Sequence, residues 1–299
     1  MSLILNDKAR ANIRHASGPY KLVDSKQGTF MVNENDHYIG RSMLKYGQFL
    51  EAQCRIFASI LNMIPHKIAI DVGANIGLFT IAMAKAFKDK GYIFAFEPFP
   101  LNYQLLSTNI LLSGLQNISP YMFGLSNLKE TRMTAQRTAD QMINFGEIIF
   151  KDLPSENSSD HTQLKAKFLT LDDHFDSIEP GFIKIDAEYM EIKVIEGAKK
   201  TIMRSKPILY VENIFVGVPG MQHLSKRLIQ TMWDIDYECA WHVCSMFEKD
   251  NFFGDDENIF SNTASVDMVC VPKHLRPSIK TFTAIKDLDA KPFSIRNGS

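Results

Sequence analysis

The chain has 299 residues, of which 45% are hydrophobic and 22% charged, so it is long enough to bury a full core without disulfides or metal ions. Its formal net charge is only −1, which argues against a protein that coats nucleic acid. No run of about 18 apolar residues is present, so a membrane-spanning helix is not expected.

The start of the chain and its cysteines both favour a cytoplasmic protein. Residues 1–14 contain no apolar core followed by a small-residue cleavage site, unlike a secretory signal. The four cysteines form no CxxC pair, so neither a zinc knuckle nor a redox motif is indicated. We therefore expect free, buried thiols in a reducing compartment.

Residues 1–66 are expected to form a small N-terminal helical cap. A short strand is predicted over 29–32, and apolar residues at helical spacing over 39–63 predict one or two helices. Pro65 then ends this segment.

From residue 67 onward, short apolar runs alternate with amphipathic stretches. Strands are predicted over 68–72, 92–96, 119–124, 182–186, 208–212, 237–242 and 268–271, and helices over 77–88, 101–113, 190–204 and 221–233. This alternation predicts parallel strands joined by crossover helices, which makes an α/β sheet covered on both faces. The domain is expected to span residues 67–275.

Two segments lack this alternation. Residues 134–167 are polar, with a turn-rich stretch over 154–159, and are expected to form a long inserted loop that is a functional lid or partly disordered. Residues 276–299 are expected to be a tail that packs loosely or frays.

The most informative segment follows the first strand of the domain and opens a helix; it reads Asp71-Val-Gly73-Ala74-Asn75-Ile-Gly77. Gly73 allows a tight turn, and asparagine at position 75 tolerates a left-handed backbone. A dinucleotide fingerprint needs glycines at the first, third and sixth places, and two of these fail here. The acid at position 71 would repel a pyrophosphate. It suits a cofactor with an amino group and a sulfonium, which is S-adenosylmethionine.

A second acid ends the next strand of the domain. Glu97 lies 20 residues after Gly77 and precedes Pro98. An acid at this position can accept hydrogen bonds from both hydroxyls of a ribose. The alternative is that Asp71 caps a helix and Glu97 is an ordinary surface acid, but the ordered pair on consecutive strand tips favours cofactor binding.

The two motifs resemble the class I S-adenosylmethionine-dependent methyltransferases. Residues 182–198, FIKIDAEYMEIKVIEGA, are more specific and are similar to the FkbM family, whose pattern runs close to iKiDvEG-x-E-x-x-v-l-x-Ga. The chain departs from that pattern at Ala187 and at Tyr189, where the family has glycine. The order of Trp241-His242, 251–254, 257–260 and 265–271 also fits one branch of the family, so the resemblance covers about residues 39–273.

The resemblance implies a Rossmann-like fold with a seven-stranded, mostly parallel sheet, and O-methylation of hydroxyls on sugars and natural products. Residues 47–51 resemble an aromatic-acid element of the family, which implies that Glu51 lies near the methionine end of the cofactor. The expected cofactor-binding residues are Glu51, Asp71, Gly73, Ala74, Asn75, Gly77, Glu97, Pro98, Asn102 and Asp186.

A sugar hydroxyl is a poor nucleophile, so methyl transfer to it needs a general base or a metal ion. Because the active site of an open α/β sheet lies beyond the carboxyl ends of its strands, we expect Asp186, Glu188, the Glu212-Asn213 pair and His242 to gather there. In one arrangement Asp186, Glu212 and Asn213 bind Mg²⁺, as in catechol-type O-methyltransferases, and a vicinal diol chelates the ion.

In the other arrangement His242 is the base and Asp186 or Glu212 orients its ring. Three structural alternatives stay open at this point: an interior His242, a helix-capping Asp186, and Glu191 and Glu196 as solvated helix acids or salt-bridge partners.

The leading hypothesis is therefore an O-methyltransferase that acts on a small-molecule or glycan hydroxyl. Alternatives are N-methylation of a small molecule and a cofactor-binding module without catalysis. A nucleic-acid target is disfavoured, because residues 186–189 contain no proline of the kind found in exocyclic-amine methyltransferases. Oligomerisation is compatible with the sequence, which does not specify it.

Overall fold

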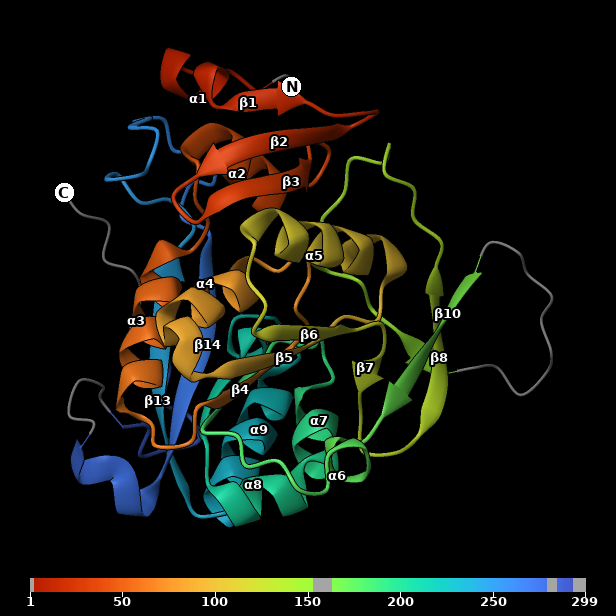
Figure 1. The fold of residues 1–299 in the computed structure, drawn as a ribbon. Coiled ribbons are helices and arrows are strands. Elements are labelled where there is room, and N and C mark those ends of the chain that lie inside the picture. The colour runs from red at the N-terminus through yellow and green to blue at the C-terminus, as the bar shows by residue number, and fades with distance from the viewer. Residues whose placement is uncertain (1–2, 153–162, 279–283, 293–299) are drawn as a thin grey trace.

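The computed structural model describes residues 3–152, 163–278 and 284–292. Seven strands of this described part form one central sheet in the order β13-β14-β12-β11-β4-β5-β6 (Figure 1). Their bounds are β4 Ile68–Val72, β5 Tyr92–Phe96, β6 Ile118–Tyr121, β11 Phe182–Ile185, β12 Ile208–Glu212, β13 Tyr237–Ser245 and β14 Ala264–Pro272. All neighbours from β12 to β6 pair in parallel, and β14 pairs antiparallel with β12 and β13. The predicted α/β fold is confirmed.

Helices cover both faces of this sheet. One face is packed by α3 (Glu51–Met63), α4 (Leu78–Phe87) and α5 (Pro100–Ser113), and the other by α6 (Leu171–His174), α7 (Glu191–Gly197), α8 (Lys199–Ser205) and α9 (Gln222–Asp234). Short 3₁₀ turns follow at η1 Lys88–Lys90, η2 Ile214–Val216 and η3 Lys273–Ser278. The predicted helix over 190–204 divides at Ala198 into α7 and α8. Within the described ranges, no helix is long and apolar enough to cross a membrane.

Burial explains why these segments form these elements. The middle strands β4 and β11 are apolar along most of their length because the sheet is covered on both faces, as is usual for parallel strands. Helix α4 is apolar on nearly all sides, since it lies between the sheet and α3. Helix α3 belongs to the same layer, where the ring of Phe57 packs edge-on against Tyr210 at 4.7 Å.

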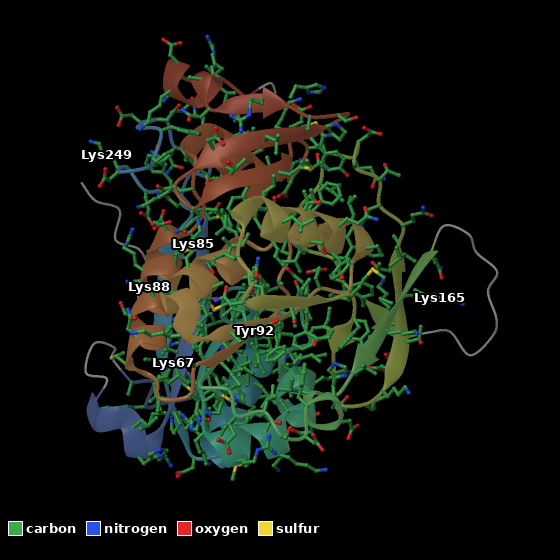
Figure 2. All side chains as sticks on the ribbon, in the orientation of Figure 1. Lys67, Lys85, Lys88, Tyr92, Lys165 and Lys249 are labelled. Atoms are coloured by element: carbon green, nitrogen blue, oxygen red, sulfur yellow. The ribbon has the colours of Figure 1, made fainter. Side chains whose placement is uncertain are left out.

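The N-terminal segment is less helical than expected. It contains α1 (Asp7–Ala11), an antiparallel sheet of β1 (Ile13–His15), β2 (Tyr20–Ser25) and β3 (Gly28–Asn33), and then α2 (Ile39–Tyr46). The predicted strand over 29–32 lies within β3, whose Phe30 and Val32 alternate into the core. Gly47, at a φ of +67°, ends α2 and so splits the helical region before α3. Lys85 of α4 donates to the Gln27 carbonyl and ties this sheet to the domain (Figure 2).

The predicted inserted loop is partly a second sheet. Strands β7 (Gly124–Leu125), β8 (Glu130–Ala135), β9 (Lys151–Asp152) and β10 (Gln163–Leu169) pair in the order β7-β10-β8-β9. Residues 136–150 contain no helix or strand, as expected for a loop, whereas the prediction missed the parts that belong to β8, β9 and β10. Strand β10 was missed because it alternates one buried apolar residue with one exposed lysine and carries no long apolar run. The predicted strand over 119–124 is likewise divided between β6 and β7. The turn-rich stretch 154–159 lies outside the described residues.

Part of the C-terminal tail packs more tightly than expected. Residues 284–292 lie beside the edge strand β13, where the Ile285 N–H donates to the Cys239 carbonyl at 2.7 Å. The Ile285 side chain is buried, so this part of the tail covers the open edge of the sheet.

Candidate active site

A cavity of about 310 Å³ opens at the carboxyl ends of β4, β5, β11 and β12. Its lining includes nine residues predicted from the sequence: Gly73, Ala74, Asn75, Glu97, Pro98, Asn102, Asp186, Glu188 and Glu212. Five aromatic rings from other parts of the chain complete its walls: Tyr38, Phe49, Phe79, Phe150 and Phe168. The location agrees with the rule that open α/β sheets bind ligands beyond the carboxyl ends of their strands.

The loop after β4 lies between the ends of β5 and β11 and contacts both. Its Gly73 and Ala74 N–H groups both donate to the Phe96 carbonyl at 3.0 Å. On the other side, a Cβ atom at position 73 would lie 1.7 Å from the Asp186 carbonyl oxygen, and φ at Gly73 is +74°. Only glycine satisfies both conditions, so this residue lets the loop lie against the end of β11.

Glu97 is the acid that holds this loop from the end of β5. One carboxylate oxygen accepts from the Asn75 N–H at 2.8 Å and the other accepts from the Phe99 N–H at 2.9 Å. Burial raises the pKa of Glu97 to about 7, against the opposing effect of these two N–H donors. Asn75 adopts the left-handed backbone expected for it, with a φ of +51°.

Asp71 lies behind the loop and does not line the cavity. Its side chain is fully buried and accepts from the Thr80 hydroxyl at 2.6 Å, while Lys184 Nζ lies 3.2 Å away. The expectation that its charge faces a sulfonium is not supported, because Lys184 already neutralises it. Gly77 is also outside the cavity lining: a Cβ there would lie 2.6 Å from Leu106 Cδ1, so it serves helix packing.

Glu51 is another predicted cofactor residue that the structure does not bring to the cavity. It is buried at the start of α3, where its carboxylate lies 3.4 Å from Lys26 Nζ and 3.2 Å from Gln27 Nε2. The preceding residues Phe49 and Leu50 line the cavity instead.

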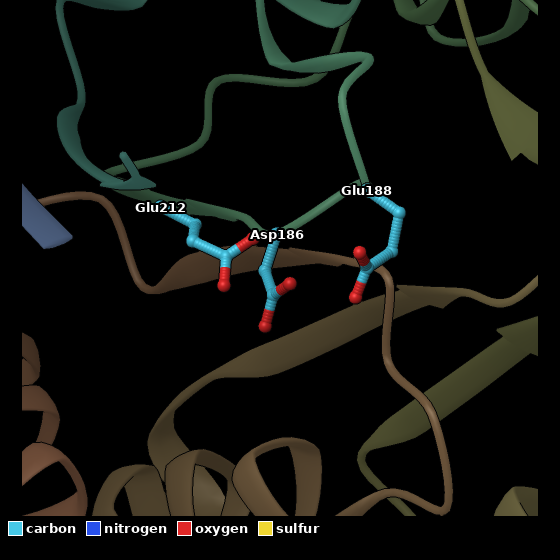
Figure 3. A group of neighbouring side chains, drawn as sticks. All are labelled: Asp186, Glu188 and Glu212. Atoms are coloured by element: carbon cyan, nitrogen blue, oxygen red, sulfur yellow. The ribbon is translucent and has the colours of Figure 1, made fainter. Parts of the chain in front are cut away.

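Three carboxylates converge on the cavity wall (Figure 3). Asp186 follows β11, Glu188 lies on the next turn and Glu212 ends β12, and each has an oxygen within 4.8 Å of the others. Burial, together with repulsion from neighbouring acids, raises the pKa of Glu188 to about 9 and that of Glu212 well above its usual value. Such a cluster cannot keep every carboxylate ionised, so it holds at least one proton near neutral pH.

Asn213 does not join this cluster, although it was predicted as a metal ligand with Asp186 and Glu212. Its side chain is fully buried, and Nδ2 lies 3.3 Å from the Met268 sulfur. Asn213 is also absent from the cavity lining. The carboxylate that lies beside Asp186 and Glu212 is that of Glu188, where the Asn213 amide was expected.

His242 was predicted as the general base, and the structure places it outside the cavity lining. Its Nδ1 lies 2.6 Å from the Tyr210 hydroxyl, and burial lowers its pKa to about 4. The sequence argument assumed that β13 lies directly beside β12. In the sheet β14 lies between them, so Asp267 separates His242 from Glu212.

Lys184 is the site residue that sequence reasoning missed. Its ammonium lies within 3.3 Å of both Asp71 and Asp186 and donates to the Gly73 carbonyl at 3.2 Å. Burial lowers its pKa, but the two carboxylates outweigh that effect and raise it. The sequence does contain a signal for this ion-paired lysine. Lys184 lies inside the apolar strand FIKI, and a buried lysine is almost always paired.

The ligand-free protein is expected to lose stability as the pH rises from 7 to 9. Unfolded glutamates ionise at about pH 4, whereas the folded pKa is about 7 for Glu97 and about 9 for Glu188. The stability that a raised folded-state pKa contributes is lost as the pH rises from the unfolded pKa to the folded one, so between pH 7 and 9 the loss comes mainly from Glu188. His242, with a pKa of about 4, does not titrate in this window. Thermal denaturation should show a melting temperature several degrees lower at pH 9. Equal melting temperatures would contradict the burial of these acids.

Comparison with known proteins places the sequence in a family. The sequence model of the family described as Methyltransferase FkbM domain matches residues 71–239. Methyltransferase sdnD of Sordaria araneosa is 38% identical over 69 residues, which are 23% of this chain and 26% of that protein. The structure of Methyltransferase FkbM from Methylobacillus flagellatus KT shares 17% identity at a TM-score of 0.41 and covers 68% of this chain and 43% of that one. O-methyltransferase TomG from Streptomyces achromogenes, solved in complex with SAM, shares 10% identity at a TM-score of 0.43, over 74% and 79% of the two chains.

The sheet order and the cavity at its carboxyl edge define a class I methyltransferase fold. The family match covers more than half of the sequence, and the chain belongs to the FkbM methyltransferase family. The matched regions span less than two thirds of sdnD and of the Methylobacillus protein.

Proposed function

We propose that this enzyme transfers the methyl group of S-adenosylmethionine to a hydroxyl of a sugar, a glycan or a related natural product. The observation that carries the proposal is the placement of the Asp186, Glu188 and Glu212 carboxylates on the wall of a cavity with aromatic sides. Aromatic rings stack on the apolar faces of sugars, and carboxylates take up the proton that a hydroxyl must lose.

The glycine loop and Glu97 are the proposed cofactor site. Each carboxylate oxygen of Glu97 accepts one backbone N–H and keeps a free lone pair, so the pair of oxygens can accept the two ribose hydroxyls. Asn102 supports this assignment: it lines the cavity, is buried, and its Oδ1 has no hydrogen-bond partner among the described residues. An unsatisfied buried oxygen of this kind is suited to a ligand donor.

We propose that the carboxylate cluster, rather than His242, accepts the hydroxyl proton. Asp186 is paired with Lys184 at 3.3 Å, whereas Glu188 and Glu212 have raised pKa values. A carboxylate whose pKa is raised is a stronger base once it is ionised. The positive sulfonium of a bound cofactor would favour that ionised form and thereby prepare the cluster to accept the proton.

The same three carboxylates offer a second route through Mg²⁺. They form a hard oxygen donor set of mutually repelling acids, which fits a divalent cation. A bound Mg²⁺ would lower the pKa of the hydroxyls of a vicinal diol. In this route Asp186, Glu188 and Glu212 would hold the ion, with Glu188 in the position first assigned to Asn213.

One observation favours N-methylation as a second candidate activity. Among the described residues, five carboxylates line the cavity, at Glu97, Glu147, Asp186, Glu188 and Glu212, and Lys184 is the one basic side chain in the lining. This charge balance attracts an amine and repels phosphates, so we propose a small-molecule or glycan acceptor and no nucleic acid.

The four free cysteines support a cytoplasmic location.

The test is methyl transfer from labelled S-adenosylmethionine to matched acceptor pairs, each a sugar and its amino-sugar counterpart, with Mg²⁺ or with EDTA. We expect transfer to the hydroxyl compound, with the new methyl group on oxygen. Transfer that survives EDTA supports proton uptake by the carboxylates alone, and transfer that needs Mg²⁺ supports the metal route. Transfer to the amino group alone would overturn the proposal in favour of N-methylation.

A further inference from the structure

The turn that presents Glu188 to the cavity has a strained backbone. Glu188 and the following Tyr189 have φ values of +47° and +72°, and neither is a glycine. Two consecutive left-handed residues with side chains are unfavourable, and such strain persists only where neighbouring groups hold it. One neighbouring group that holds the turn is Phe215, whose ring contacts the Tyr189 ring with centroids 5.6 Å apart.

The second group that holds the turn is Glu191, the first residue of α7. Its side chain is only 2% exposed, and one carboxylate oxygen accepts from the Ala187 N–H at 3.1 Å. Burial raises the pKa of Glu191 to about 7, while the N–H groups of Glu191 itself, Ala187 and Tyr189 lower it. The carboxylate therefore faces the backbone of the strained turn.

This position differs from the sequence expectation, which treated Glu191 and Glu196 as solvated helix acids. Glu196, in the last turn of α7, fits that expectation, since its carboxylate contacts Asn127 and Arg227 on the surface. Glu191 was mispredicted because its burial depends on the turn before the helix, which the helical spacing of apolar residues does not reveal.

We propose that Glu191 is a positioning residue, which holds the Ala187–Tyr189 turn so that the Glu188 carboxylate stays beside Asp186 and Glu212. This inference rests on the proposed role of these three carboxylates in methyl transfer. The turn is short and the cavity is adjacent, so loss of the hydrogen bond to Ala187 would let the backbone relax and withdraw Glu188 from the cluster.

The kinetic test compares Glu191→Ala, which removes the acceptor oxygen, with Glu191→Gln, which retains it. For Glu191→Ala we expect kcat to fall about a hundredfold, as small displacements of reacting groups do, with an unchanged dissociation constant for S-adenosylmethionine. Glu191→Gln should keep most of the activity. Adding Tyr189→Gly to Glu191→Ala should restore part of kcat, because glycine adopts the left-handed backbone without strain and position 189 then no longer needs the contact with Phe215. Glu196→Gln is the control from the same helix and should match the wild type.

A second measurement needs no acceptor, so it separates failure of this inference from failure of the proposed function. Crystal structures of the wild type and of Glu191→Ala compare the position of the Glu188 carboxylate, which in the wild type lies beside Asp186 and Glu212. In Glu191→Ala we expect the backbone at Glu188 and Tyr189 to leave the left-handed region and the carboxylate to lie away from the other two, and Tyr189→Gly should bring it back. An unmoved Glu188 carboxylate in Glu191→Ala, or a Glu191→Gln protein as impaired as Glu191→Ala, would overturn the inference.

Discussion

Replacement of Gly73 by alanine is expected to weaken S-adenosylmethionine binding about a hundredfold or more, as displaced site geometry commonly does. The new Cβ would lie 1.7 Å from the Asp186 carbonyl oxygen, so either the glycine loop or the end of β11 must move. Both carry residues of the cavity wall, which means that either movement disrupts the cofactor site. Isothermal titration calorimetry measures the loss directly.

Gly114→Ala is the matched control for this substitution. Gly114 ends α5 with a φ of +68°, so alanine there meets the same backbone penalty, but no atom lies within 4 Å of the added Cβ. It should lower the melting temperature slightly and leave cofactor binding intact. If both variants bind S-adenosylmethionine equally well, the contact between the loop and β11 does not shape the cofactor site.

The double substitution Glu188→Gln with Glu212→Gln is expected to lower kcat about 10²- to 10⁴-fold, the usual contribution of general acid–base catalysis. It removes the two carboxylates of raised pKa and leaves the ion pair between Asp186 and Lys184 in place. Steady-state assays with an acceptor found in the transfer screen give kcat. Glu179→Gln, which removes an exposed acid paired with His66, is the control.

The melting temperature of the double variant should rise, because two buried acids with raised pKa values no longer have to be ionised above neutral pH. This combination of greater stability and lower activity is a mark of a functional cluster. Full turnover in the double variant would show that another group accepts the proton.

The sequence predicts the elements of the central sheet well, because strands that are buried on both faces appear in the sequence as short apolar runs. The strands 68–72, 92–96 and 208–212 are reproduced to the residue. The polar insertion is harder to predict, since β10 buries only alternate residues and the buried residues of β8 include the polar Arg132 and Thr134. Pairing between such strands is a tertiary property that their local composition does not disclose.

The cofactor half of the site is also more predictable than the catalytic half. Gly73 and Glu97 act through local loop geometry, which leaves a motif in the sequence. The assignment of His242 depended on strand order, and the antiparallel insertion of β14 moved it away from Glu212. Lys184 and Glu191 act through partners that folding brings to them, Asp71 for the former and the strained turn for the latter.

The proposed function requires the cofactor sulfonium to bind beside the Asp186, Glu188 and Glu212 carboxylates. Calorimetry of S-adenosylmethionine and S-adenosylhomocysteine binding at pH 7, in buffers of different ionisation enthalpy, counts the protons released. Because a positive sulfonium lowers the pKa of nearby acids such as Glu188, whose pKa is about 9, S-adenosylmethionine should release more protons than the uncharged thioether. Equal proton release for the two ligands, or no binding of either, would contradict this placement.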